Sequence, residues 1–524
     1  MKRILNIIIA GTVLLGASSC KKYLDVNTNP NAATSSTPDL VLPQAIVYTA
    51  AQVSSFNDYG SRTVGYSVNA GGYGGFGSVW TYDYATSEMN GLWNTTYDVL
   101  EDFQYVITST QGSTTYAYYN AAARIMKAYN FQLLVDEYNN IPYTKALQGS
   151  NAVVPTYDNG KDIYPALANQ IDSALALING NPLALNLTAA TDPLFGGNMT
   201  LWKQFANTIK LRLIIRGTGA TTFANNTFDP AGFLTTDAIV NPGYAKASGQ
   251  QNPSWNTWVT GYTNSAGARS YIPGEFAFGY YNGAKLTDPA RGNAIYYNFP
   301  NTPINQMGIG TVSVPNAPAT AGAWYAATPA TIPAVGALGN NIGVMKGYNM
   351  GEPLMLAAES YFLQAEANVR GIVAGTAQTN FLNGITASFA YLYKLPNGST
   401  QTGYNAAADA ATYQTANAGS YLVNFSLALT TAQKTEAIIT QKYIALNFIH
   451  GHEAWNEYRR TKYPVSSGIT TNNPYGSMAS VLSSSTRPDK LPTRVQYPAS
   501  EYSYNASNVP SGISVFSSLI FWAQ

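Results

Sequence analysis

The chain has 524 residues, only 10% of them charged, and a formal net charge of +1, which argues against a polyanion-binding surface, so we expect no nucleic-acid partner. Cysteine occurs once, so no intramolecular disulfide is possible and stability must come from packing. With 39 Tyr, 8 Trp and 19 Phe beside many Asn, Thr and Ser, the composition suits contact with a neutral ligand such as a sugar or peptide, or equally a low-charge extracellular surface without a ligand.

The N-terminus is similar to a bacterial lipoprotein signal. Lys2 and Arg3 precede an apolar run over 4–15 that is too short to cross a bilayer, and small residues then lead to Cys20. We expect residues 1–19 to be removed and Cys20 to carry the lipid, because several acyl chains together anchor a protein stably. An ordinary secretory signal with a chance cysteine is the alternative. The polar residues 20–37 then predict a flexible tether.

Helical periodicity dominates the rest of the chain. It predicts helices over about 38–53, 86–107, 115–138, 163–178, 199–216, 353–370 and 430–448. Pro353 suits a first helical position, and Thr430 with Gln433 resembles a capping box. Paired helices of similar length indicate a mainly α fold that is compatible with a degenerate helical-repeat scaffold.

Three long irregular stretches, over 66–84, 223–347 and 464–524, interrupt this pattern, and such stretches are usually functional loops. A sugar stacks on an exposed ring flanked by neutral hydrogen-bonding groups, so their aromatic residues are the ligand-binding candidates. These candidates are Tyr73, Trp80, Tyr82, Tyr84, Trp255, Trp258, Tyr262, Tyr271, Trp324 and Tyr325. Each alone more often packs a loop, but we expect at least two to meet at one exposed patch.

Other polar constellations favour structural roles. His450 and His452 could bind a metal with Glu453, but no third His or Cys is near, so capping or hydrogen bonding is the preferred interpretation and no metal is expected. The segment 453–460 predicts an ion-pair and stacking network, and 288–291 predicts a turn with a local Asp–Arg pair. No nucleophile elbow or outstanding carboxylate pair is present, so neither an enzyme nor a cofactor is expected.

Several segments that follow one another along the chain carry a family resemblance. They are 20–25 with the following Asn-Pro-Asn, 93–97, 202–213, 288–291, 352–367, 441–446, 451–460 and 492–501. Together they resemble the SusD/RagB family of nutrient-binding outer-membrane lipoproteins. The resemblance implies a mainly α fold, in which tetratricopeptide-like helix pairs support a large loop-rich ligand-binding region. It also implies a single domain over 38–524, with its chief insertions at 66–84 and 223–347.

The same resemblance implies a cell-surface, lipid-anchored protein of a Gram-negative outer membrane. It would capture a glycan, or in some branches a peptide, and deliver it without chemistry to a SusC-like TonB-dependent transporter, acting as its lid. Ligand sites vary within the family, so no binding residue is transferred. The alternatives are a lipid-anchored glycoside hydrolase, which needs two carboxylates in an open cleft, and a structural helical-repeat adaptor, which needs an apolar partner face.

Overall fold

The computed structural model describes residues 36–524 apart from 266, 269, 312–322, 326–340, 470 and 472–473. The signal peptide, Cys20 and most of the tether lie outside the described residues. Within them the chain is mostly helical, which confirms the predicted fold class.

The elements fall along the chain as follows. The longer helices are α2 (Pro38–Thr63), α4 (Asn90–Ser109), α5 (Ala117–Tyr138), α6 (Gly160–Gly180), α7 (Met199–Gly217), α11 (Ala357–Val369), α12 (Ala377–Leu392), α13 (Ala406–Ala416), α14 (Thr431–Ala445) and α15 (Gly451–Thr461). The short ones are α3 (Ser78–Thr81), α8 (Pro253–Trp258), α9 (Glu275–Phe278), α10 (Pro289–Ile295) and α16 (Ala499–Tyr504). The strands are β1 (Ser67–Asn69), β2 (Ala238–Val240), β3 (Tyr271–Pro273) and β4 (Glu352–Met355).

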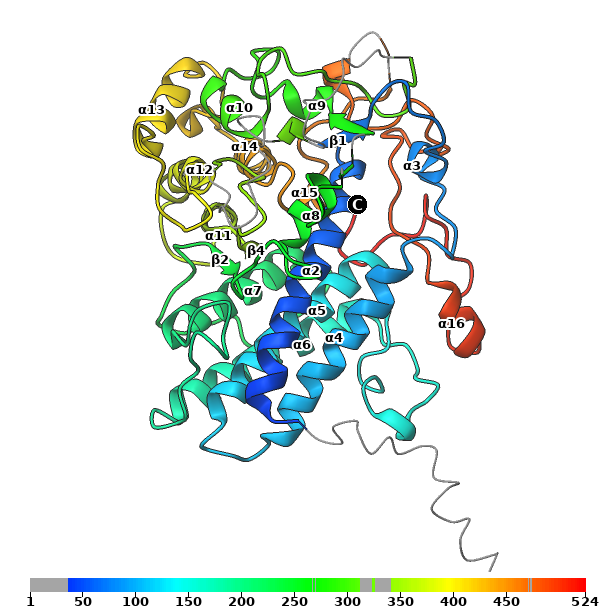
Figure 1. Ribbon diagram of the computed structural model, residues 1–524, viewed down its shortest axis with the longest axis vertical. Coiled ribbons are helices and arrows are strands. Elements are labelled where there is room, and N and C mark those ends of the chain that lie inside the picture. The colour runs from blue at the N-terminus through cyan, green and yellow to red at the C-terminus, as the bar shows by residue number, and fades with distance from the viewer. Residues whose placement is uncertain are drawn as a thin grey trace, which may run out of the picture.

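The long helices form two groups of packed neighbours (Figure 1). In the first group α4 packs on α5, α5 on α6 and α6 on α7, while α2 lies along α4. In the second group α11 packs on α12 and α14, and contacts between α7 and α11 join the two groups. Helix α4 illustrates the reason for this packing. One face of it is a buried apolar stripe that a neighbouring helix must cover, made by Leu92, Val99, Leu100 and Phe103. This arrangement confirms the predicted helix-pair scaffold.

Two small antiparallel ribbons correct the predicted helix at 353–370. Strand β1 pairs with β3, with Val68 opposite Ile272, and β2 pairs with β4. Pro353 therefore lies in β4, opposite Ile239, and α11 begins only at Ala357, after an extended Leu356. The helix starts late because pairing with β2 holds residues 352–355 in an extended conformation. By contrast, the capping box of Thr430 and Gln433 is confirmed at the start of α14.

Helices α2 and α15 cross at two glycines. A Cβ atom at Gly60 would lie 2.1 Å from the backbone nitrogen of His452, and one at Gly451 would lie 2.2 Å from that of Ser61. The Asn57 side chain secures the crossing, because its Oδ1 accepts a 2.8 Å hydrogen bond from the Gly451 N–H and its Nδ2 donates to the Phe448 carbonyl. The two backbones are therefore in direct contact.

Ionised side chains fill the space between α5, α7, α11, α14 and α15. Arg216 contacts Asp136 at 2.7 Å and also contacts Glu453, while Arg460 makes hydrogen bonds of 2.7 Å to both oxygens of Glu366. Arg460 also pairs with Glu457 at 2.5 Å, so the predicted network at 453–460 is confirmed. This set is the buried charge network. Such groups stay ionised in the interior only when opposite charges and hydrogen bonds compensate for lost water.

The two histidines lie beside this network and are buried. Burial lowers the pKa of both imidazoles, and a ring nitrogen of His450 lies 2.8 Å from the Pro353 carbonyl oxygen. Among the described residues, no group of three or more His, Cys, Asp or Glu side chains is placed to hold a metal ion. The predicted local pair is present too, since Arg291 contacts Asp288.

Candidate ligand-binding site

Three half-buried rings, those of Phe76, Trp80 and Tyr271, form the ring cluster beside the β1–β3 ribbon. Phe76 and Trp80 stack with centroids 5.3 Å apart and planes 30° apart, and Phe76 meets Tyr271 edge-on at 5.4 Å. The Gly-rich stretch before α3 allows this, because Gly72, Gly75 and Gly77 adopt positive φ values that side chains disfavour. It turns back tightly enough to bring Phe76 and Trp80 onto the side of Tyr271.

Polar contacts fix the edges of the rings. Trp80 Nε1 donates to Asn69 Oδ1 at 2.9 Å, and the same oxygen accepts from the Gly308 N–H at 2.8 Å. The Arg62 guanidinium lies 4.5 Å from the Tyr271 ring centroid and is paired with Asp58 at 2.6 Å. Because the Trp80 N–H and the guanidinium already have partners, the rings offer a ligand mainly their apolar faces.

Buried rings pack against Tyr271 and thereby support the ring cluster. Trp258 meets Tyr271 edge-on at 5.9 Å and Phe448 at 4.6 Å, and Phe448 stacks on Tyr325 with centroids 3.6 Å apart and planes 2° apart. These residues come from three distant parts of the chain and are each at most 1% exposed. Close packing on all sides restricts ring motion, so the cluster stands on a rigid base.

The structure divides the ten predicted aromatics into buried and accessible rings. Six of the candidates are buried: Tyr82, Tyr84, Trp255, Trp258, Trp324 and Tyr325. The Tyr82 hydroxyl accepts a hydrogen bond from the Ser480 N–H, and the Tyr84 ring packs edge-on against Tyr59, so neither has a free face. Burial of such large rings contributes more to stability than exposure would, which explains the outcome.

The remaining candidates reach the surface. Tyr73 is 43% and Tyr262 is 47% exposed. Trp80 and Tyr271 both contact Phe76, so two of the candidates lie at one patch, although both rings are half-buried rather than exposed. Phe76 was missing from the candidates, although its place between Tyr73 and Trp80 in the same Gly-rich stretch was a signal. Ligand binding by these residues stays a prediction.

Comparison with known proteins gives one family over nearly the whole chain. Residues 30–498 match the SusD-like family model, described as starch-binding and associating with the outer membrane. No curated protein sequence matches the chain.

Solved structures give the same picture for the fold. A SusD homologue from Bacteroides fragilis is 19% identical, with a TM-score of 0.66 over 94% of this chain and 100% of that one. A SusD homologue from Bacteroides uniformis is 22% identical, with a TM-score of 0.63 over 92% and 99%. A chitin-binding protein is 20% identical, with a TM-score of 0.63 over 93% and 99%. At such identities these likenesses establish the fold alone.

Proposed function

The chain belongs to the SusD-like family of nutrient-binding proteins that associate with the outer membrane, and from that premise we propose that it captures a neutral glycan oligomer at the cell surface. Lipid on Cys20 would anchor it there. Among the described residues, no helix is both long and apolar enough to cross a membrane. It would pass the ligand unchanged to a SusC-like TonB-dependent transporter and act as its lid.

The ring cluster of Phe76, Trp80 and Tyr271 is the observation that carries this proposal. Sugar rings have one face of C–H groups, which packs on an aromatic face, and hydroxyls that bond to polar groups around it. The cluster offers partly accessible ring faces, held in place by Asn69 and by buried rings. Such a site binds without reorganising, which reduces the entropy cost of capture. Tyr73, exposed in the same loop, is proposed to add a further contact.

The test is binding of the lipid-free mature chain, starting after Cys20, to a panel of glycans and peptides by calorimetry. Replacing Trp80 with Ala removes one stacking face, so we expect affinity for the bound glycan to fall about tenfold, or about 1.4 kcal/mol. Tyr48→Ala removes a ring that is 48% exposed on α2, away from the cluster, and should leave affinity unchanged.

The same mixtures distinguish capture from hydrolysis. Ligand recovered at full length supports a binding protein. Shortened products that vanish when a cleft carboxylate is replaced would move the protein to the hydrolases. Equal affinities for the wild type and the Trp80→Ala variant would show that the ring cluster is not the site.

A further inference from the structure

A second cleft, separate from the ring cluster, opens between α4, residues 142–155 and α16. Its volume is about 440 Å³, within the usual range for sites that bind small ligands. Trp93 and Tyr97 of α4 line one side, and Tyr504 of α16 stands at the other. None of the sequence patterns indicated this cleft, because its walls come from three distant segments.

The aromatic walls are partly fixed and partly free. The Tyr97 hydroxyl donates to the Pro142 carbonyl at 2.7 Å, and Trp93 packs between Tyr97 and Tyr157 at 5.0 and 6.1 Å. Tyr504, by contrast, is 83% exposed, although a large ring usually gains by being covered. The cleft thus combines a rigid aromatic wall with an unused ring face at its mouth.

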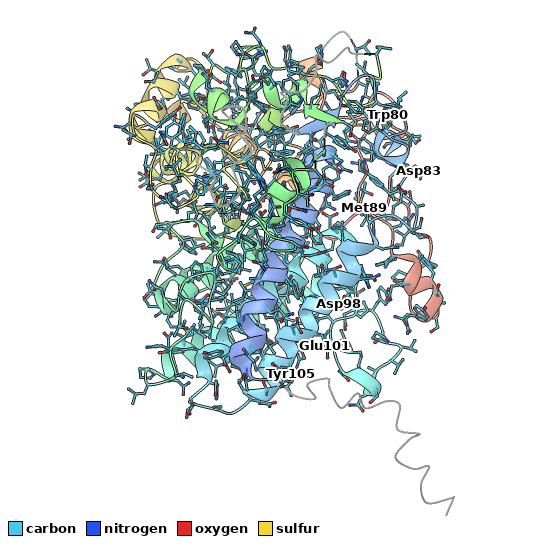
Figure 2. The ribbon with its side chains drawn as sticks, in the orientation of Figure 1. Trp80, Asp83, Met89, Asp98, Glu101 and Tyr105 are labelled. Atoms are coloured by element: carbon cyan, nitrogen blue, oxygen red, sulfur yellow. The ribbon has the colours of Figure 1, made fainter. Side chains whose placement is uncertain are left out.

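The charges of the cleft are all negative. Asp98 and Glu101, one turn apart on α4, line it together with Glu501 of α16, and neither Lys nor Arg is among its described lining residues. In the described part of the chain, the Asp98 and Glu101 carboxylates make no hydrogen bond or ion pair. Figure 2 labels both side chains on α4, between the labelled Met89 and Tyr105.

Glu501 is held in place by its neighbours. Its Oε2 accepts from the Tyr157 hydroxyl at 2.6 Å and from Asn505 at 3.1 Å, and Oε1 makes no contact of this kind in the described residues. Lys127 of α5 attracts Glu101, but its ammonium donates to the amide oxygen of Gln104. The cleft therefore keeps negative charge that its own lining residues do not neutralise, in a protein of which only 10% of the residues are charged.

We propose that this cleft binds the protonated primary amine of an extended ligand, that is, a unit of an aminosugar oligomer or a lysine side chain of a peptide. The carboxylates would neutralise the ammonium, and ring faces attract a cation that is placed over them. The proposal rests on the proposed function, because the ring cluster would hold a neutral part of the ligand while the cleft selects a charged one.

Paired probes that differ by one N-acetyl group at each amine, and therefore in charge, test this proposal. Calorimetry at low salt compares a chitosan oligomer with the fully N-acetylated oligomer of the same length, and a lysine peptide with its acetyl-lysine form. Each exposed carboxylate contributes roughly two- to fivefold to the binding of a cation, so we expect both amine forms to bind about tenfold more tightly than their neutral partners. Added salt should reduce this preference because it screens charges.

The combined variant Asp98→Asn with Glu101→Gln should abolish the preference. Both side chains are exposed, so the fold should tolerate the change. The control variant Asp162→Asn with Glu436→Gln removes the same charge from α6 and α14 and should keep the preference. Tyr504→Ala should weaken binding of the amine forms only.

The outcomes separate this inference from the proposed function. Equal binding of charged and neutral probes, no binding of any amine probe, or a preference that survives in the combined variant would overturn the cleft assignment while leaving capture at the ring cluster intact. An amine preference that persists when no neutral glycan binds, and that is unaffected by Trp80→Ala, would overturn the proposed function instead and support the cleft. A preference for only one amine probe would identify the ligand as glycan or peptide.

Discussion

Replacing Gly60 with Ala should separate two helices that now touch. The new methyl group would lie 2.1 Å from the His452 nitrogen, 2.3 Å from the Gly451 carbonyl carbon and 2.5 Å from the His452 Cα, all backbone atoms that cannot rotate away. An ordinary contact needs about 3.4 Å, so α2 and α15 must move apart by roughly 1.3 Å. Overpacking of this kind costs about 1–3 kcal/mol, and stretching the Asn57 bond to Gly451 costs about 1 kcal/mol more.

We therefore expect Gly60→Ala to lower the free energy of unfolding by about 3 kcal/mol in urea titrations followed by circular dichroism. Gly91→Ala is the matched control, because that glycine lies in α4 with no atom within 4 Å of the added carbon. The control should stabilise the protein by about 0.5–1 kcal/mol, since alanine restricts the unfolded chain. A Gly60→Ala variant as stable as the wild type would refute the contact between the two backbones.

Three further variants test buried groups. Glu453→Gln removes the counter-charge of two buried arginines and should lower the free energy of unfolding in urea by about 3–5 kcal/mol. The control Asp489→Asn changes a partly exposed pair and should lower it by less than about 1 kcal/mol. Similar losses in the two variants would contradict the buried charge network. Burial raises the pKa of Glu352 to about 7, so the contribution of its protonated form to stability is full below about pH 4.5 and is lost as the pH rises through 7. Glu352→Gln should remove up to about 3 kcal/mol of this pH dependence of the unfolding free energy. An unchanged pH profile in the variant would contradict the raised pKa. Trp258→Ala should lower the free energy of unfolding by about 3–5 kcal/mol, because this ring is fully buried. Trp80→Ala should lower it far less, because that ring is only half-buried. Thermal unfolding of the two variants checks this order, and the reverse order would contradict it.

Local signals in the sequence predicted the scaffold well. Helix α14 begins where Thr430 and Gln433 cap it, since both partners of the capping box lie within one turn. Pro353 misled the prediction because the strand that it joins, β2, lies more than a hundred residues earlier in the chain. Capping is local chemistry, whereas strand pairing depends on a partner that the surrounding residues do not reveal.

The same distinction explains the candidate site. Trp258 and Trp80 each lie in a loop-rich stretch of the sequence. Phe448 packs against Trp258, whereas Trp80 stays half-buried. The stretch 66–84 holds the exposed Tyr73 beside the buried Tyr82 and Tyr84, because which rings stay accessible depends on contacts between segments far apart in the chain. The sequence did not indicate the second cleft for the same reason, since α4 and α16 lie far apart in the chain.

The buried charge network also determines what the protein presents to its neighbours. Among the residues that the structure describes, 18 charged side chains are buried, about a third of the chain's 28 Lys and Arg and 27 Asp and Glu. The other charged side chains nearly cancel one another, since the formal net charge of the whole chain is only +1. Copies anchored side by side would repel one another only weakly, so they could gather densely around a shared ligand chain. Added salt should alter such crowding little, because a net charge near zero leaves little repulsion between copies for salt to screen.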